Sequence, residues 1–325
     1  MSTAEKTLAH LAGIPGLRVA AGEPLARYTR FAIGGPADIY AETASVDAFI
    51  AALDACRNSG LAHVVIGGGT NLIVSDEGFR GIVLRFTADC VVADGPRIRA
   101  DAGAELGRVV DYAINAGLAG IETLAGIPGS FGAAIYGNAG AYGHSMSEAV
   151  DAVRFFDGRS VRVFGNAECA FRYRESIFKR NREWIVFSAE LLLAPADRKD
   201  LRRAADKIVA VRNAKFPPAL KCAGSIFKNL LFAELPPDAA SALPEKVVRE
   251  GKVPAAYFLE QAGAKGAAKG DIRVADYHAN LIYNAGAGTA RDLCELIAEL
   301  KSHVRDRFGI ELEEEVQYVG FEDRA

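Results

Sequence analysis

The sequence lacks the features that mark membrane, secreted and nucleic-acid-binding proteins. No apolar run in its 325 residues reaches the roughly 18 residues that a membrane helix needs. The N-terminus, residues 1–13, lacks the basic start and the long apolar centre of a signal peptide. The formal net charge is only -3 and no stripe of basic residues appears, so nothing predicts binding to nucleic acid.

Cysteine is also scarce. The five cysteines are an odd number, and neither a CxxC pair nor a His/Cys cluster occurs among them. They are Cys56, Cys90, Cys169, Cys222 and Cys294. Such scattered cysteines predict neither a disulfide framework nor a structural zinc site. We therefore expect no metal and a reducing, cytoplasmic compartment.

Composition and periodicity predict a globular α+β protein. Half of the residues are hydrophobic and 24% are charged, and the length suits two or three compact domains. Helices are predicted after Ser45, from Leu106 to Gly117, from Leu201 to Arg212 and between Thr289 and Gly309; strands are predicted in LAHVVI, GIVLRF, AVRFFDG, SVRVFG, WIVFSAELLL and LEEEVQYVGF. This order favours several modest sheets over one doubly wound sheet, and Pro217-Pro218 is the best candidate linker.

A triple glycine follows an apolar run in VVIGGGTNLIVSDEGFRG, residues 64–81. Such a loop suits a phosphate, but a dinucleotide fingerprint would require glycine at position 72, where the chain has Leu72. No Gly-Lys-Ser/Thr triplet occurs, which excludes a Walker loop. Taken alone, the triple glycine is more typical of a tight turn.

A second glycine-rich loop, LAGIPGSFGAAIYGNAGAYG, spans residues 124–143. Pro128 would interrupt an ordinary dinucleotide-binding turn there. Glycine lets main-chain N–H groups approach an anion with no side chain in the way, so two such loops can hold a pyrophosphate from both sides. The pair therefore predicts a cofactor site more strongly than either loop alone.

Both loops, with five further segments in the same order, resemble the UDP-N-acetylenolpyruvoylglucosamine reductase (MurB) family of FAD enzymes. The segments lie between about Tyr28 and Gly320 and read YTRFAIGGPAD, GGGTNLIVSDEGFRG, LAGIPGSFGAAIYGNAGAYG, FRYRESIFK, AGSIFKN, EQAGAKG and LEEEVQYVG. Residues 174–215 form a short stretch that lacks the tyrosine-bearing loop of some members. The resemblance is therefore to the shorter subclass.

The resemblance implies an α+β architecture. An FAD-binding fold of the vanillyl-alcohol-oxidase/PCMH type would comprise two α+β subdomains, residues 1–85 and 86–214. The final strand, in residues 310–325, would join the first subdomain. Residues 215–309 would form a C-terminal α+β substrate-binding domain, with the double proline at its start.

The resemblance also implies which residues hold noncovalent FAD. They are Ile33, Gly34 and the adjacent Gly35; Gly67, Gly68, Gly69, Thr70, Asn71 and Leu72; Gly126, Ile127, Pro128, Gly129, Ser130 and Gly132; and Asn138, Ala139 and Gly140.

A reaction follows from the resemblance. NADPH would reduce the flavin, which would pass hydride to UDP-N-acetylglucosamine enolpyruvate and give UDP-N-acetylmuramate for peptidoglycan. The negative charge that develops on the substrate needs a cation and a proton donor. The matching residues are Arg174, whose planar guanidinium can grip a carboxylate in two places, the proton donor Ser225, and Glu315, which would stabilise the enol. Without the motifs, these would pass for a surface arginine, a turn serine and an exposed glutamate.

The resemblance assigns a second set of residues to the substrate carboxylate, diphosphate and sugar: Tyr173, Lys215, Lys228, Asn229 and Lys265. The partners are small molecules, and we expect a monomer. The chain departs from the family pattern at Ala133, at Tyr136 and at Leu230, where residues 230–244 form an additional stretch.

Two alternatives remain open from the sequence. One is another FAD oxidoreductase of the same fold, such as an alcohol oxidase; those usually tether flavin through His or Cys, and neither loop has a histidine before His144. The other is a noncatalytic flavin or nucleotide-sugar binding protein. A proton donor such as Ser225 would serve no purpose in mere binding, which argues against it.

Overall fold

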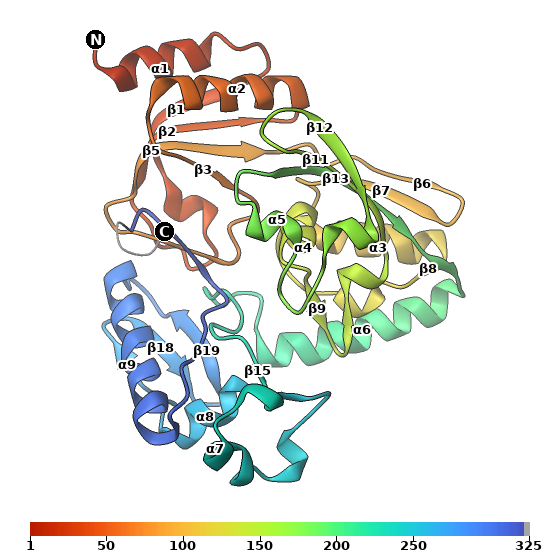
Figure 1. Ribbon diagram of the computed structural model, residues 1–325, viewed down its shortest axis with the longest axis vertical. Coiled ribbons are helices and arrows are strands. Elements are labelled where there is room, and N and C mark those ends of the chain that lie inside the picture. The colour runs from red at the N-terminus through yellow and green to blue at the C-terminus, as the bar shows by residue number, and fades with distance from the viewer. Residues whose placement is uncertain (322–325) are drawn as a thin grey trace. The chain divides into compact units, whose positions relative to one another are not determined.

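The structure is a computed structural model, and it describes residues 1–321 (Figure 1). The helices are α1 (Thr3–Ala12), α2 (Val46–Ser59), α3 (Leu106–Ala116), α4 (Phe131–Tyr136), α5 (Ile177–Arg180), α6 (Arg198–Lys215), α7 (Pro237–Ser241), α8 (Ala255–Gln261) and α9 (Ala290–Phe308). The longer strands are β1 (Arg18–Pro24), β2 (Pro36–Thr43), β3 (His63–Ile66), β4 (Leu72–Val74), β5 (Phe79–Phe86), β6 (Val91–Asp94), β7 (Arg97–Asp101), β11 (Val150–Phe156), β12 (Val161–Gly165), β13 (Ile185–Leu192), β18 (Ile272–Ala275), β19 (His278–Asn284) and β20 (Gln317–Val319). Two-residue strands are β8 (Leu118–Ala119), β9 (Gly140–Ala141), β10 (His144–Ser145), β14 (Ala194–Pro195), β15 (Leu230–Leu231), β16 (Lys252–Val253) and β17 (Ala268–Lys269).

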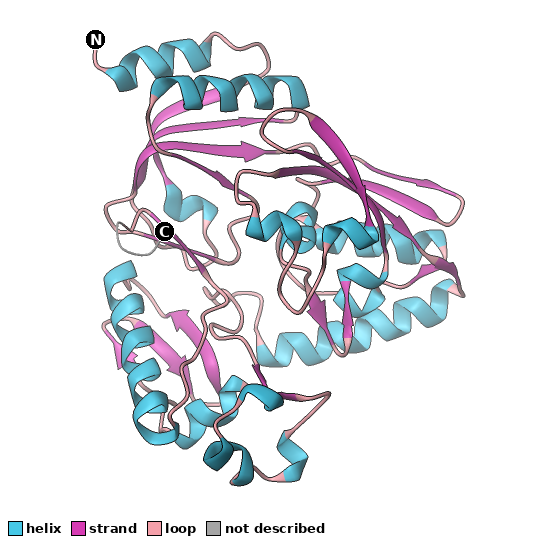
Figure 2. Cartoon of the chain, viewed as in Figure 1, coloured by secondary structure: helices cyan, strands magenta, loops and turns pink. Residues whose placement is uncertain are grey.

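The mixture of elements confirms the predicted α+β class, with several separate sheets (Figure 2). The chain divides into two compact units. Unit 1 comprises Met1–Glu23, Ala37–Gly68 and Arg80–Ala214, and unit 2 comprises Pro24–Pro36, Gly69–Phe79 and the chain from Lys215 onward. The break after Ala214 lies just before the double proline. The predicted three-domain division stays a prediction.

Unit 1 is built on two larger sheets, beside two short two-stranded ones. In the first, with strand order β1-β2-β5-β3, β3 and β5 pair in parallel, and α1 and α2 lie along one side (Figure 1). The second is antiparallel, with order β12-β11-β13-β7-β6. The helix predicted after Ser45 is confirmed as α2, and the Ser45 side chain accepts a hydrogen bond from the Ala48 N–H. Gly117 ends α3 as predicted, at a φ of 73°.

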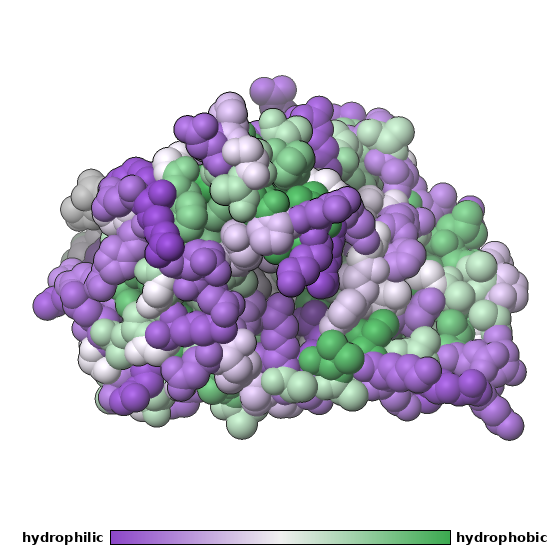
Figure 3. All heavy atoms as spheres, turned by 90° about the horizontal axis from the view of Figure 1, so that it is seen from below, coloured by the Kyte–Doolittle hydropathy of each residue, from purple (hydrophilic) through white to green (hydrophobic). Residues whose placement is uncertain are grey.

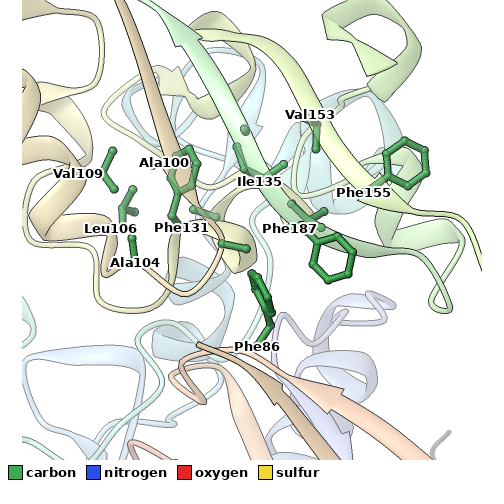
Figure 4. Close-up of a cluster of buried hydrophobic side chains, with 14 of the residues drawn as sticks. Phe86, Ala100, Ala104, Leu106, Val109, Phe131, Ile135, Val153, Phe155 and Phe187 are labelled. Carbon is green, nitrogen blue, oxygen red and sulfur yellow. The ribbon is translucent and has the colours of Figure 1, made fainter. Parts of the chain in front are cut away.

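Helix α4 is anchored in the core of unit 1 by its apolar residues. Phe131 and Ile135 are fully buried, and they lie among side chains that include Ala100 and Phe187 (Figure 4). Phe187 also makes an edge-to-face contact with Phe49, at 5.9 Å between ring centroids. This packing fixes the position of the helix that lies within the second glycine-rich segment, residues 124–143.

Unit 2 contains the antiparallel sheet β17-β18-β19, and α9 packs against it (Figure 1). Helix α9 begins and ends where the sequence predicts. Thr289 and Asp292 form a capping box, and Gly309 follows the last turn at a φ of 65°. The additional stretch 230–244 includes α7, and it contributes buried Leu235 to the core of this unit.

The last predicted strand is shorter than the sequence indicates. β20 covers only Gln317–Val319 and pairs in parallel with β4, with Gln317 opposite Leu72. Upstream, the Glu315 N–H donates to the carbonyl of Ile226, so residues 313–315 pair with a different segment. The prediction of one continuous strand from Leu312 was therefore wrong. Residues 322–325 of the predicted C-terminal segment lie outside the described residues.

No helix within residues 1–321 is long and apolar enough to cross a membrane. Figure 3 shows one face of the molecule, where hydrophilic side chains predominate and hydrophobic ones gather in separate patches.

Candidate active site

The two glycine loops meet within unit 1. The Gly68 N–H donates to Oγ of Ser130 at 3.3 Å. A Cβ on Gly67 would lie 2.8 Å from that same Oγ, and a Cβ on Gly68 would lie 2.9 Å from the Ser130 main-chain nitrogen. Glycine at both positions is therefore what allows the loops to approach so closely.

This approach suits a pyrophosphate. Two glycine-rich segments lie side by side here, and main-chain N–H groups of such segments are donors that a pyrophosphate can use. The predicted residues Gly67, Gly68, Gly129 and Ser130 are thus brought together. Gly126, at a φ of 74°, lies in the same loop, whereas Gly132 lies inside α4 and lets that helix pack closely on Ala102.

The predicted cofactor residues Ile33, Gly34 and Gly69 to Leu72 lie in unit 2, whereas Ile127, Pro128 and Asn138 to Gly140 lie in unit 1. A Cβ on Gly69 would lie 1.5 Å from the carbonyl oxygen of Tyr28, and a Cβ on Gly34 would lie 2.7 Å from Cβ of Val74. Thr29 Oγ1 donates to the Ile33 carbonyl at 2.7 Å and accepts from the Ile33 N–H at 3.2 Å. These contacts hold the loop that carries Ile33 and Gly34.

Arg174 lies at a tight two-residue turn in unit 1. Arg172 and Glu175 exchange main-chain hydrogen bonds of 3.0 and 3.1 Å, which leaves Tyr173 and Arg174 at the tip. Arg174 has a φ of 57°, in the left-handed region that an arginine adopts at a cost. Its guanidinium lies 5.5 Å from the ring centroid of Tyr173 and donates to the Gly140 carbonyl at 3.1 Å.

The neighbouring segments hold this turn in place. Nδ2 of Asn138 donates to the Arg172 carbonyl at 2.9 Å, and Lys179 donates to the Arg174 carbonyl, also at 2.9 Å. The fully buried Ser176 donates to the carbonyl of Tyr136 at 2.7 Å. The structure thus brings Tyr173 and Arg174 next to predicted cofactor residues Asn138 and Gly140.

Ser225 and Glu315 come together in unit 2. Ser225 is half-buried and follows Gly224, whose φ is 81°. It pairs with Leu281 of β19, while the next residue, Ile226, accepts a hydrogen bond of 2.7 Å from the Glu315 N–H. On its other side, the carbonyl of Glu315 accepts from Nδ2 of Asn71 at 2.8 Å. Asn71, predicted to bind FAD, therefore contacts the main chain of a predicted catalytic residue.

The predicted substrate lysines are already engaged within unit 2. Lys228 is ion-paired with Glu313, and Lys265 is ion-paired with Glu260. Nζ of Lys215 lies 5.1 Å from the ring centroid of Phe216. The remaining predicted residue, Asn229, is exposed.

Three residues that the sequence did not single out, His278, Asp76 and Ser176, also hold segments of the two units in place. His278 packs edge-to-face on Phe216, and burial, together with the charges of Lys215 and Lys265, lowers its pKa to about 4. The Asp76 carboxylate accepts hydrogen bonds of 2.8 and 3.0 Å from the N–H groups of Ala290 and Arg291, at the start of α9. Ser176 could have been found as a helix N-cap, because its side chain accepts from the Lys179 N–H. His278 and Asp76 contact residues far away in the sequence, so no local sequence pattern could have identified them.

The chain matches known proteins along most of its length. Residues 37–163 match the FAD binding domain family, and residues 216–319 match the C-terminal domain of UDP-N-acetylenolpyruvoylglucosamine reductase. The reductase of Solibacter usitatus strain Ellin6076 is 65% identical over 310 residues, which covers 95% of this chain and 99% of that protein. The reductase of Bacillus subtilis strain 168 is 35% identical and covers 93% of this chain and 94% of that protein.

A solved structure of a reductase also matches this chain along most of its length. The crystal structure of the Thermus caldophilus reductase (MurB) superposes with a TM-score of 0.72 at 29% identity, covering 93% of this chain and 98% of that one. The predicted fold, an FAD-binding domain followed by a C-terminal domain of this type, is confirmed. The chain belongs to the UDP-N-acetylenolpyruvoylglucosamine reductase family.

Proposed function

We infer that the protein reduces UDP-N-acetylglucosamine enolpyruvate to UDP-N-acetylmuramate, with NADPH as hydride donor and FAD as cofactor, in peptidoglycan precursor synthesis. The observation that carries this function is the 65% identity to a reductase over 95% of the chain. Family membership favours the reductase over the oxidase that the sequence left open.

We propose that FAD binds noncovalently between the glycine segments. The close approach of Gly67 and Gly68 to Ser130 supports a grip on its pyrophosphate. When bound, FAD would supply the hydride chemistry that links NADPH to the enolpyruvyl double bond. The other predicted cofactor residues, Ile33 to Gly34, Gly69 to Leu72, Gly126 to Gly132 and Asn138 to Gly140, would line the same cofactor.

Arg174 binds the substrate carboxylate in this proposal. Its strained backbone supports the role, since strained backbone conformations occur preferentially at functional sites. Contacts with Gly140 and Tyr173 restrict the guanidinium before substrate arrives, which reduces the entropy lost on binding. The positive guanidinium stabilises the negative charge that develops on the enolate.

Ser225 donates the proton to the substrate carbon, and Glu315 stabilises the enol. A serine hydroxyl is a weak acid, and it can act here because the enolate that it faces is strongly basic. The hydrogen bond from Glu315 to Ile226, next to Ser225, supports a shared task. Tyr173, Lys215, Lys228, Asn229 and Lys265 would hold the carboxylate, diphosphate and sugar.

The compartment, the oligomeric state, the subclass and the domain bounds are also proposals. We place the protein in the cytoplasm as a monomer of the shorter subclass, with subdomains at 1–85 and 86–214 and a substrate domain at 215–309. Light scattering after gel filtration tests the monomer, because a dimer would elute with twice the mass of 34.5 kDa.

The function is tested by separating its two half-reactions. Anaerobic NADPH should bleach the flavin absorbance, and the enolpyruvyl substrate should then restore it. Denaturation should release free FAD. A flavin that NADPH reduces but the enolpyruvyl substrate cannot reoxidise would overturn the proposed reaction and leave a flavin-binding protein or another oxidoreductase.

A further inference from the structure

We propose that Asn280 is a positioning residue that holds the proton-donor segment, residues 225–228, in register. The proposal rests on the role assigned above to Ser225. Asn280 lies in β19 (Figure 1), and its side chain is 2% exposed. A polar side chain so deeply buried must have its hydrogen bonds satisfied by protein groups.

The side chain of Asn280 binds both polar groups of one residue. The Phe227 N–H donates to its Oδ1 at 2.9 Å, and its Nδ2 donates to the Phe227 carbonyl at 2.9 Å. Next to this pair, the Ile226 N–H donates to the main-chain carbonyl of Asn280 at 3.2 Å, and Ser225 pairs with Leu281. The asparagine amide thus continues the pairing with β19 where main-chain partners for Phe227 end.

The opposite edge of the segment carries the other proposed catalytic group. The Glu315 N–H donates to the Ile226 carbonyl at 2.7 Å, and the Lys228 N–H donates to the Glu313 carbonyl at 2.9 Å. Residues 225–228 are therefore held between β19 on one side and residues 313–315 on the other. A shift of this segment therefore displaces Ser225 relative to residues 313–315.

Burial makes the contact with Asn280 hard to replace. Ile226 and Phe227 are almost completely buried, at 0% and 1% exposed, so water cannot take over the N–H and C=O of Phe227. When the amide is altered, the segment must move to find other partners. Proton transfer depends steeply on the donor's position, so a small displacement of Ser225 is enough to slow it.

Asn284 provides a matched control on the same strand. It is also buried, at 4% exposed, and its Nδ2 donates to the Phe31 carbonyl at 3.0 Å. Its Oδ1 accepts from the N–H groups of Gly286 and Gly288, each at 3.0 Å. The residue type, strand and depth are the same, but none of these contacts reaches residues 225–228.

The test compares Asn280→Asp with Asn284→Asp in the holoenzyme. Aspartate has nearly the shape of asparagine, but at position 280 its carboxylate cannot donate to the Phe227 carbonyl. We expect Asn280→Asp to be reduced by NADPH at the wild-type rate. Its reoxidation by the enolpyruvyl substrate should fall by about 10- to 100-fold. In D₂O, its product should lose the one-faced placement of deuterium at the α-carbon.

Asn284→Asp should keep the wild-type ratio of the two rates, whatever it does to stability. If Asn280→Asp slows both half-reactions equally, or if Asn284→Asp shows the same selective fall, Asn280 is merely structural and the proposal is wrong. Should Asn280→Asp fail to retain FAD, Asn280→Ala allows the same comparison, because it removes both contacts with Phe227 without adding a charge.

A double variant separates this inference from the proposed function. Because Asn280 acts through Ser225, adding Asn280→Asp to Ser225→Ala should change the remaining reoxidation rate little. An equal fold-loss in both backgrounds would overturn the role of Asn280 and leave that of Ser225 intact. Normal turnover by Ser225→Ala alone would refute both the proton-donor role of Ser225 and the positioning role of Asn280.

Discussion

Arg174 combines a costly backbone conformation with a restrained guanidinium. At a φ of 57° any residue with a Cβ is strained by about 1 kcal/mol, and glycine is not. The cost of the backbone and the use of the side chain can therefore be measured separately.

For the side chain, we expect Arg174→Lys to reoxidise its flavin with substrate far more slowly, while reduction by NADPH changes little. Lysine keeps the charge but loses the planar fork. Stopped-flow absorbance of the two half-reactions checks this. An equal fall in both would mean that Arg174 has a structural or shared role.

For the backbone, Arg174→Gly and Arg174→Ala both remove the guanidinium, and we expect both to lose the substrate half-reaction. Gly should nevertheless be the more stable variant by roughly 1 kcal/mol in urea unfolding, because only Ala retains the left-handed strain. Equal stability would show that the turn relaxes when the arginine is removed.

Ser225 permits a sharper test of protonation. Ser225→Ala should be reduced by NADPH at a near-normal rate, because that step involves no substrate proton. Turnover of the enolpyruvyl substrate should fall by about 10² or more. Ser225→Cys should recover part of the rate, since a thiol can also donate a proton. Normal turnover by Ser225→Ala would assign the donor to another group or to water.

His278 makes stability depend on pH. Its pKa is lowered from 6.5 to about 4 in the folded protein, first by burial and then by Lys215 and Lys265, with Glu260 acting in the opposite direction. As pH falls from 6.5 to about 4, the unfolded chain takes up a proton that the folded chain does not. Stability contributed by neutral His278 is therefore present above pH 6.5 and is lost through this window.

We expect the wild type to lose about 2 kcal/mol more than His278→Gln when urea unfolding is compared at pH 7.5 and pH 4.5. Other titrating groups are common to both proteins, so they cancel in the difference. Parallel losses would show that His278 titrates normally in the folded protein.

At the scale of elements, the contact between the glycine loops can be separated from ordinary glycine effects. A Cβ on Gly68 would press on the Ser130 main chain, whereas a Cβ on Gly107, in α3, would meet no atom within 4 Å. We expect Gly68→Ala to weaken FAD affinity at least about 10-fold, because the loops must move apart. Gly107→Ala should raise the free energy of unfolding by about 0.5–1 kcal/mol with FAD affinity unchanged. Fluorescence titration of the apoproteins measures the FAD affinity of each variant, and urea unfolding measures its free energy of unfolding. An unchanged FAD affinity in Gly68→Ala would show that the contact between the loops is not part of the FAD site.

At the scale of the whole molecule, FAD should stabilise the fold by binding only the native state. Free FAD at about 100 times its Kd should add roughly 2.7 kcal/mol, seen as a rise in the Tm of the apoprotein. Riboflavin, which lacks the pyrophosphate, should raise the Tm much less. An equal rise with riboflavin would show that the glycine loops do not grip the pyrophosphate.

The sequence by itself determined the elements with local signals. Ser45 and Thr289 begin their helices, and Gly117 and Gly309 end theirs, because a cap acts on residues within one turn. The glycine-rich and charged motifs, which occur in the same order along the chain as in the family, were likewise sufficient to identify the family. Both kinds of information lie within short stretches of chain, so they can be read without knowing the fold.

Tertiary structure decided what depends on distant partners. The last strand is short because its neighbouring residues have different partners. The Glu315 N–H donates to the Ile226 carbonyl, whereas Gln317 pairs with Leu72 of β4. Asn280 looks like any strand asparagine until the chain folds and leaves Phe227 beside it. A hydrogen bond between residues far apart in sequence depends on which segments pack together. That choice is made by burial of the whole core, and no local pattern encodes it.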